Sequence, residues 1–307
     1  GTNLAVTTRD FLLTGTDAIN YQLAQPTGLR ASITPMDLTP LRLTLTRQVM
    51  ATLNNQQVAG LSPDQVSYLS TEQFGALSAS QLANLSPAAW SRVSTTSVGN
   101  LTPAQIASMR ADAWAYWLAS QVRVLRPDQL QALTTTQLAG WGSTQLQAID
   151  NTQWQALSLQ QRQSLTATQI SAFSPSQVAT WSNSTLSELT NTQLTGLSTA
   201  QITPLTTTQV NAFTASQWPA WSRSQIAALT KTQIAALTPS HLSLWSTAQL
   251  AALNAAQVAA LSFDQLNALS STQKSQLAAT GQLQQWLGTE VARVQANATA
   301  TSANRAL

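Results

Sequence analysis

An eight-residue repeat limits what this chain can fold into more than any other feature. From Leu53 to Leu277 every eighth residue is large and apolar, without a single insertion, which gives 28 full octads. We number the positions of an octad as slots 1 to 8. Slot 2 is Ser, Thr, Asn or Asp in 24 octads, slot 5 is Gln in 23, and slot 6 is apolar in 26. The consensus is L-S/T-x-x-Q-I/L/V-x-A.

The slots match the sequence signals of a helix start. A Ser or Thr followed three residues later by Gln is typical of a capping box, in which each side chain bonds the other residue's backbone N–H. In the octad that begins at Leu229, Thr230 is the expected N-cap, and Gln233 is expected to bond back to it. Leu229 and Ile234 have the spacing of a hydrophobic staple. Pro in slot 3 and acids in slot 4 favour the same register.

Two simpler structures conflict with the period. Eight residues turn an α-helix through about 800°, about 80° past two full turns, so one long helix would have no apolar face. The gaps between apolar residues alternate between five and three, which places successive large side chains on opposite faces of a strand. Helices of one or two turns are unstable alone. The sequence therefore predicts a mainly α fold, a tight α-solenoid of about 28 capping-box repeats.

The repeat divides the chain into three parts. Residues 53–281 are expected to form the solenoid. Residues 1–52 contain extended runs such as LRLTLT (41–46) and turn signals such as QPTG (25–28), and we expect an extended or mixed N-terminal cap. Residues 282–307 should form an amphipathic helix followed by a polar tail, because apolar residues recur there at helical spacing. These residues are Leu283, Trp286, Leu287, Val291 and Val294.

Nine of the ten tryptophans occupy slots 1 and 6, and only Trp286 lies outside the repeat. We interpret them as core residues, with an exposed ladder of ligand-binding aromatics as the alternative. The two charged residues in slot 6, Arg162 and Lys274, should mark local departures, and Leu159 is expected to compensate for Arg162.

The chain offers little material for catalysis. It has no cysteine, and its one histidine, His241, occupies slot 5, where imidazole can imitate the backbone contact of Gln. Most acids are explained by helix starts, and no P-loop, GxGxxG or GxSxG motif occurs. We therefore predict no enzyme activity, no catalytic, metal or cofactor-binding residues, and no cofactor. An enzyme carried on residues 1–52, with Asp10, Asp17 and Asp37, is the third alternative.

Charge and hydropathy restrict the partners. Only 8% of residues are charged, against about 25% in typical proteins, and the net charge is +3. No basic cluster suits phosphate contacts, so we expect no nucleic-acid partner. No apolar stretch approaches the roughly 18 residues of a membrane span. Because the chain begins at Gly1 instead of Met, we expect it to be a processed or excised piece.

The octads resemble the S/T-x-x-Q-I/V-x-A-L repeats that recur in large secreted or surface proteins of proteobacteria, including adhesin-like ones. The resemblance covers Leu53 to about Leu277 and implies an extracellular or cell-surface location. LSPDQV (61–66) and LTPAQI (101–106) are also similar to the first helix of TAL-effector repeats. The longer unit of that family, with its second helix and base-reading loop, is absent here, so none of its functional residues carries over.

These observations favour a non-enzymatic structural or interaction protein, an extracellular scaffold, adhesin segment or filament subunit. The alternative is a binding module, such as a secreted effector whose solenoid holds a peptide, glycan or nucleic acid. A contiguous exposed row of aromatic or Arg residues would favour the binding module. A solenoid has two ends that expose apolar surface unless they are capped, so we also expect self-association into a homo-oligomer or filament.

Overall fold

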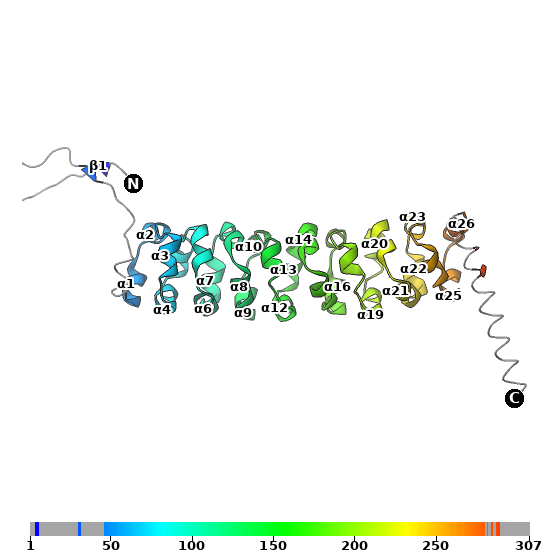
Figure 1. Cartoon of the computed structure of the whole chain (residues 1–307), viewed down its shortest axis with the longest axis horizontal. Helices are drawn as coiled ribbons and strands as arrows, with labels where there is room; N and C mark the ends of the chain where they lie inside the picture. Colours follow the sequence, from blue (N-terminus) through cyan, green and yellow to red (C-terminus); the bar gives the residue numbers. More distant parts are fainter. Residues whose placement is uncertain are drawn as a thin grey trace, which may run out of the picture.

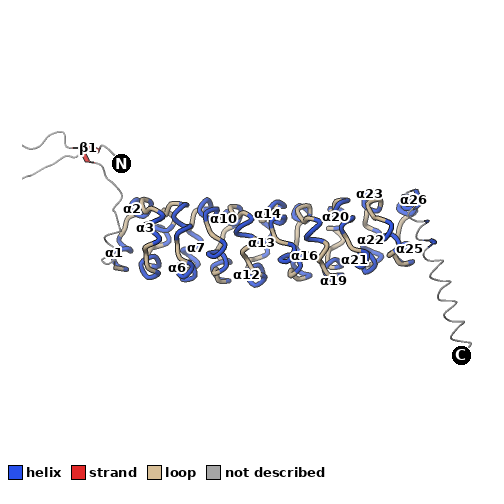
Figure 2. Tube along the Cα trace, viewed as in Figure 1, coloured by secondary structure: helices blue, strands red, loops and turns tan. Residues whose placement is uncertain are grey.

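The structure of the chain is a computed structural model, which describes residues 4–5, 30–31, 46–279, 281, 284 and 287–288. Residues 46–279 form short helices joined by tight connections and wound into a rod that follows the sequence from end to end (Figure 1). The predicted α-solenoid is confirmed. Figure 2 shows helices and loops alternating with one regular period along the whole rod.

The helices differ little in length. They are α1 (Arg47–Thr52), α2 (Asn55–Ala59), α3 (Pro63–Ser67), α4 (Thr71–Gly75), α5 (Ala79–Leu82), η3 (Pro87–Arg92), α6 (Thr95–Asn100), α7 (Pro103–Ser108), η4 (Ala111–Tyr116), α8 (Ala119–Arg123), α9 (Pro127–Gln131), α10 (Thr135–Ala139), α11 (Ser143–Leu146), α12 (Asn151–Ala156), α13 (Leu159–Ser164), α14 (Ala167–Ala172), α15 (Pro175–Ala179), α16 (Asn183–Glu188), α17 (Asn191–Leu194), α18 (Thr199–Ile202), α19 (Thr207–Asn211), η5 (Trp218–Ala220), α20 (Arg223–Ala228), α21 (Lys231–Ala236), α22 (Pro239–Ser243), α23 (Thr247–Leu250), α24 (Ala255–Ala259), α25 (Phe263–Asn267) and α26 (Ser271–Ala279).

The predicted capping box forms at Thr230. Its hydroxyl accepts from the Gln233 N–H at 3.1 Å, and the Gln233 Oε1 accepts from the Thr230 N–H at 2.7 Å. The leucine slot that follows, Leu237, is the C-cap, and its N–H donates to the Ile234 carbonyl. Each octad therefore begins and ends one helix.

One coil of the solenoid takes about three and a half octads. The Gln233 Nε2 reaches the Leu205 carbonyl, 28 residues earlier, at 2.6 Å. The backbones of successive coils come close at Gly140, where an added Cβ would lie only 2.6 Å from the Ala111 carbonyl oxygen, 29 residues earlier. Hydrogen bonds between successive coils join residues 25 to 31 apart, from the Asn211 Nδ2 on the Ala236 carbonyl to the Gln233 Nε2 on the Ile202 carbonyl.

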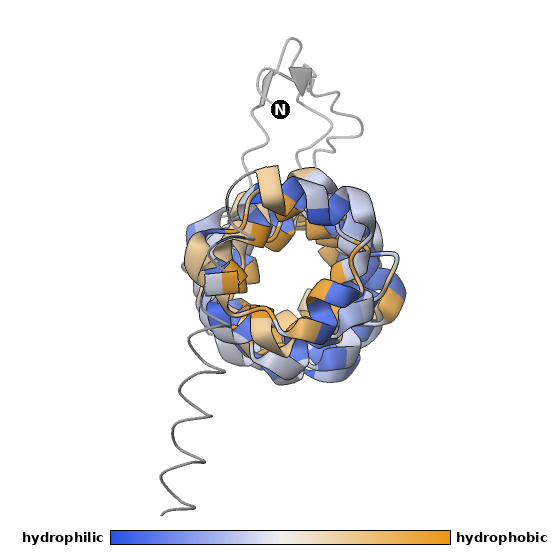
Figure 3. Cartoon of the chain, turned by 90° about the vertical axis from the view of Figure 1, so that its right-hand side faces the viewer, coloured by the Kyte–Doolittle hydropathy of each residue, from blue (hydrophilic) through white to orange (hydrophobic). Residues whose placement is uncertain are grey.

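Slots 1 and 6 line the axis of the rod. In the end-on view of Figure 3 the apolar residues lie inside the ring of helices and the polar residues outside. All nine tryptophans of the repeat are buried. The alternative prediction, an exposed ladder of ligand-binding aromatics, is therefore wrong. Several stack: the ring centroids of Trp114 and Trp117 lie 4.3 Å apart, and those of Trp154 and Trp181 lie 4.8 Å apart.

The described residues beyond 53–281 are few. Helix α1 lies inside the segment 1–52, with Thr46 as its N-cap and Met50 buried in the position of slot 6, so octad geometry begins one unit before Leu53. Strands β1 (Leu4–Ala5) and β2 (Arg30–Ala31) pair antiparallel, with Leu4 opposite Ala31.

Several predictions fall outside the described residues. They concern the turn at 25–28, the run 41–45, the three acids Asp10, Asp17 and Asp37, and most of the expected C-terminal helix and tail. Leu287 of that helix is described and is 46% exposed.

Candidate interaction surface

The slot 5 glutamines do more than cap their own helices, which the sequence analysis did not predict. The Gln233 side chain is buried, and its Nε2 donates to carbonyls of the previous coil, on Leu205 at 2.6 Å and Ile202 at 3.2 Å. The same bond to the slot 1 carbonyl 28 residues earlier is made by twenty glutamines between Gln81 and Gln273.

The sequence contained a signal for this second role. A capping box accepts Glu as readily as Gln at this position, yet slot 5 contains no Glu in any octad. Only the amide carries a donor in addition to the capping oxygen. We call these glutamines the inter-coil ladder.

The exceptions to the consensus concentrate in one stretch, residues 85–148. All four unusual slot 2 residues and three of the five unusual slot 5 residues lie there. They are Arg110, Leu118, Arg126 and Gly142 in slot 2, and Ala89, Ser97 and Ala113 in slot 5. Both octads with Ala in slot 5 form the 3-10 helices η3 and η4 instead of α-helices.

Helix α8 is the most apolar part of the outer surface in this stretch. Leu118 replaces the hydroxyl cap at its start, and Val124 is its C-cap. Tyr116 directly precedes this octad. These side chains are 49%, 36% and 49% exposed, in the order Leu118, Val124, Tyr116. Together with the exposed Arg123 they form what we call the α8 surface.

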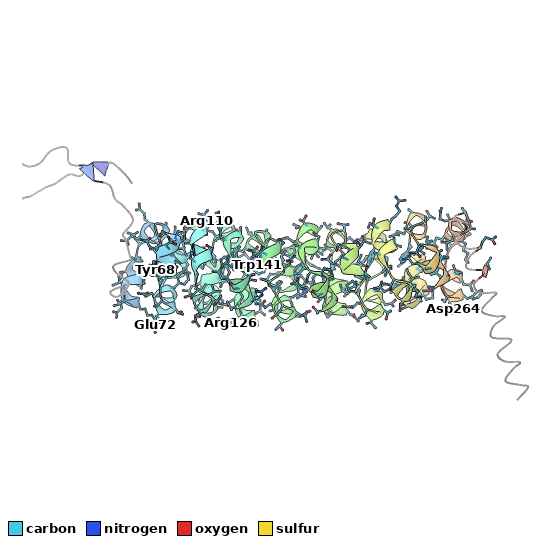
Figure 4. The ribbon with its side chains drawn as sticks, in the orientation of Figure 1. Tyr68, Glu72, Arg110, Arg126, Trp141 and Asp264 are labelled. Carbon is cyan, nitrogen blue, oxygen red and sulfur yellow. The ribbon has the colours of Figure 1, made fainter. Side chains whose placement is uncertain are left out.

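The arginines near α8 differ in their partners. Arg110 holds Asp112 through two hydrogen bonds of 2.7 and 3.0 Å, and Arg126 holds Asp128 in the same way. These guanidinium groups lower the pKa of both carboxyls. Figure 4 places Arg110 and Arg126 on opposite edges of the rod, so they form no single basic face.

Arg123 differs from these neighbours. Arg92 lies 4.0 Å from Asp64, so each of the three other arginines between 92 and 126 has its own acid. Within residues 46–279 no ion pair is found for Arg123. The α8 surface therefore combines exposed apolar groups with a positive charge that no local carboxylate neutralises.

His241 does not imitate the backbone contact of Gln. The N–H of its N-cap, Thr238, donates instead to the Asn211 Oδ1 at 3.2 Å, and the His241 Nδ1 lies 3.3 Å from that oxygen. The imidazole packs against Trp218, with ring centroids 5.8 Å apart, and its burial lowers the pKa of His241. The prediction that His241 makes the backbone contact of Gln is therefore wrong, because Asn211 accepts from the Thr238 N–H in its place.

Arg162 makes a hydrogen bond that is missing because of a second exception to the consensus, Thr185 in slot 5. Thr185 replaces the glutamine that would bond the Leu157 carbonyl 28 residues earlier, and the Arg162 Nη1 donates to that carbonyl at 2.5 Å. Arg162 also pairs with Glu188 at 2.5 Å. The expected compensation by Leu159 is wrong, because that side chain is 45% exposed.

The interior of the described rod contains unpartnered donors, because the indole N–H groups of seven tryptophans, Trp154 among them, are buried without a hydrogen-bond partner. A cavity beside Trp154 and Trp181 has a volume of about 10 Å³, space for about one water. Among residues 46–279 and the few others described, no three His, Asp or Glu side chains converge as metal ligands. No described helix is long and apolar enough to cross a membrane.

Comparison with known proteins places the chain among repeat proteins. Residues 120–159, which include most of α8 and run into α13, match the ALTTAQ repeat. No curated protein matches the chain.

Proposed function

We propose that the chain is a non-enzymatic scaffold, a spacer or adhesin segment in the extracellular space or at the cell surface. The inter-coil ladder carries this proposal. Because a buried amide joins almost every octad to the coil before it, the solenoid transmits load through its whole length instead of through one domain interface. In this proposal the length of the rod follows from the number of octads.

The outer surface supports the same role. Between residues 129 and 222 the only charged residues are Asp150, Arg162 and Glu188. Asp150 caps α12 by accepting from the Gln153 N–H at 2.8 Å, and the other two neutralise each other. Such a surface of hydroxyl, amide and methyl groups suits a spacer, because it offers few groups for non-specific ionic contacts.

Octad deletion tests the proposal. Removing the four consensus octads 197–228 keeps every Gln in register with a slot 1 carbonyl, so the rod should shorten in proportion while ellipticity per residue stays constant. Removing only 197–200 shifts half an octad out of register and should lower the unfolding temperature sharply. Small-angle X-ray scattering gives the rod length. An unchanged length after the four-octad deletion would contradict the spacer role.

The binding module remains the second candidate, and one observation favours it. The exposed Tyr116, Leu118 and Val124 with Arg123 form the kind of aromatic and arginine surface that interfaces favour. The cavity beside Trp154 and Trp181, with space for about one water, gives no support to a peptide, glycan or nucleic acid at that place inside the rod.

A further inference from the structure

The inter-coil ladder borders solvent at one place. Of its twenty glutamines between Gln81 and Gln273, all are buried except Gln177, which is partly exposed. The Gln177 Nε2 still donates to the Ile149 and Leu146 carbonyls of the previous coil, at 2.8 and 2.9 Å. The ladder is therefore intact at this point, but the side chain that continues it borders a space that solvent can enter.

The cavity beside Trp154 is this space. It lies between α12 and α15, on successive coils, and its volume of about 10 Å³ is close to the smallest that holds one water. A buried water also needs about two to four polar partners, and both coils supply polar groups. The lining includes Asp150, Asn151 and Trp154 on one coil and Gln177, Thr180 and Trp181 on the next.

Trp154 brings a donor to the cavity. The side chain is buried, and its indole N–H has no hydrogen-bond partner among the residues described. The ring stacks on Trp181 across the coils, with centroids 4.8 Å apart, and meets Phe173 edge to face at 5.1 Å, so the indole is held beside the cavity. A buried donor that stays unpaired destabilises the fold, whereas a bridging water restores its hydrogen bond.

We propose that this cavity is a binding site for one water, which accepts from the Trp154 indole N–H and donates to the Asp150 carboxylate and the Thr180 hydroxyl. Both oxygens keep lone pairs for it. One Asp150 oxygen accepts from the Gln153 N–H, and the Thr180 hydroxyl donates its hydrogen to the Gln177 carbonyl. Because Asp150 and Thr180 lie on successive coils, the water joins the coils where the ladder borders solvent.

Trp114 is the matched comparison for Trp154. It also occupies slot 6, is buried, and has an indole N–H without a partner among the residues described. It also contacts two aromatic rings, those of Trp117 and Trp141. Trp114 does not line the cavity, so the two tryptophans differ in the feature that the proposal depends on.

NMR of the full chain, with isotope-labelled indole nitrogen, tests the site directly. Trp154→Phe and Trp114→Phe each remove one indole N–H signal and so identify it in the wild-type spectrum. The Trp154 N–H should show magnetisation transfer from a long-lived bound water, and the Trp114 N–H should show none. No transfer at Trp154, or equal transfer at both, would overturn the proposal.

Stability and a third variant separate a water site from a tryptophan that only packs. Both Trp→Phe changes remove the same volume, but only Trp154→Phe also removes a satisfied hydrogen bond, so it should lower the urea midpoint more than Trp114→Phe. Thr180→Val keeps the indole and removes one acceptor of the water. It should weaken the water transfer at Trp154 without changing the circular dichroism, since Thr180 is exposed. An equal or larger loss for Trp114→Phe, or unchanged transfer in Thr180→Val, would contradict the site.

Discussion

The octads of residues 85–148 and those of residues 189–236 build the same rod from different outer residues. In 189–236 every octad has Ser or Thr in slot 2 and Gln in slot 5. In 85–148 four slot 2 residues and three slot 5 residues depart from the consensus. Yet the slot 1 and slot 6 residues of both stretches are all buried. The core therefore fixes the coil, and the capping residues can vary where the outer surface takes another composition.

The slot 5 glutamine of the capping box explains how helices in residues 85–148, which we call the variable stretch, begin without a capping hydroxyl. Leu118, Arg126 and Gly142 have no capping hydroxyl, but their N–H groups still donate to Gln121, Gln129 and Gln145 at 2.8 to 2.9 Å. Each of these glutamines also keeps its bond to the previous coil. Losing slot 2 therefore removes one hydrogen bond, whereas losing slot 5 removes the connection between coils.

Core substitutions should show that the side chains along the axis are packed equally well in the two stretches. Trp117→Ala in the variable stretch and Trp221→Ala in the uniform one should each lower the free energy of unfolding by about 3–5 kcal/mol, the usual cost of deleting a buried aromatic. Both side chains occupy slot 1 and are buried. Urea denaturation measures the loss. A much smaller loss for Trp117 would mean that the variable stretch is loosely packed.

Ladder substitutions should cost less than core substitutions and more than cap substitutions. Gln121→Ala and Gln225→Ala each leave the slot 1 carbonyl of the previous coil and a cap N–H without partners, so each should cost about 2–3 kcal/mol. Gln57 is exposed and its Oε1 caps Asn54. The control Gln57→Ala should therefore cost only about 1 kcal/mol. Equal losses at all three positions would refute the ladder as the element that joins coils.

The relation between Arg162 and Thr185 can be tested by restoring the consensus glutamine at position 185. Thr185→Gln should supply the Leu157 carbonyl with an amide donor, after which Arg162→Leu should cost less than it does in the wild type. A double-mutant cycle should give a coupling of about 1–2 kcal/mol. Additive losses would show that Arg162 does not replace the missing glutamine.

The period of the sequence was enough to predict the helix starts, the staple and the buried tryptophans, because these depend on residues within one octad. Contacts between coils could not be predicted, because the number of octads per coil is set by how helices stack and not by local signals. The amide donor of Gln233, the role of Asn211 beside His241 and the contact from Arg162 to Leu157 all depend on that number. The α8 surface lies within and next to one octad, and its signal in the sequence was Leu118 in slot 2, where 24 octads have Ser, Thr, Asn or Asp.

Restoring a cap at the α8 surface should separate stability from association. Leu118→Ser gives α8 the hydroxyl cap that the uniform octads have, so the monomer should gain about 0.5–1 kcal/mol in free energy of unfolding. Urea denaturation measures the gain. The same change removes an exposed apolar group from the α8 surface, so a partner that docks there should bind more weakly.

The matched control for this change is Gly142→Ser. It restores a cap in extended backbone, where a new Cβ comes no closer than 3.4 Å to the Gln145 Oε1, and it leaves the α8 surface unchanged. It should raise stability slightly, because glycine is only a few tenths of a kcal/mol worse than serine as an N-cap, and it should leave the binding of a partner at the α8 surface as it is. A Leu118→Ser variant that is less stable than the wild type would mean that Leu118 contributes to packing and not to an interface. The variable octads would then be tolerated variants of the repeat and not a surface for a partner.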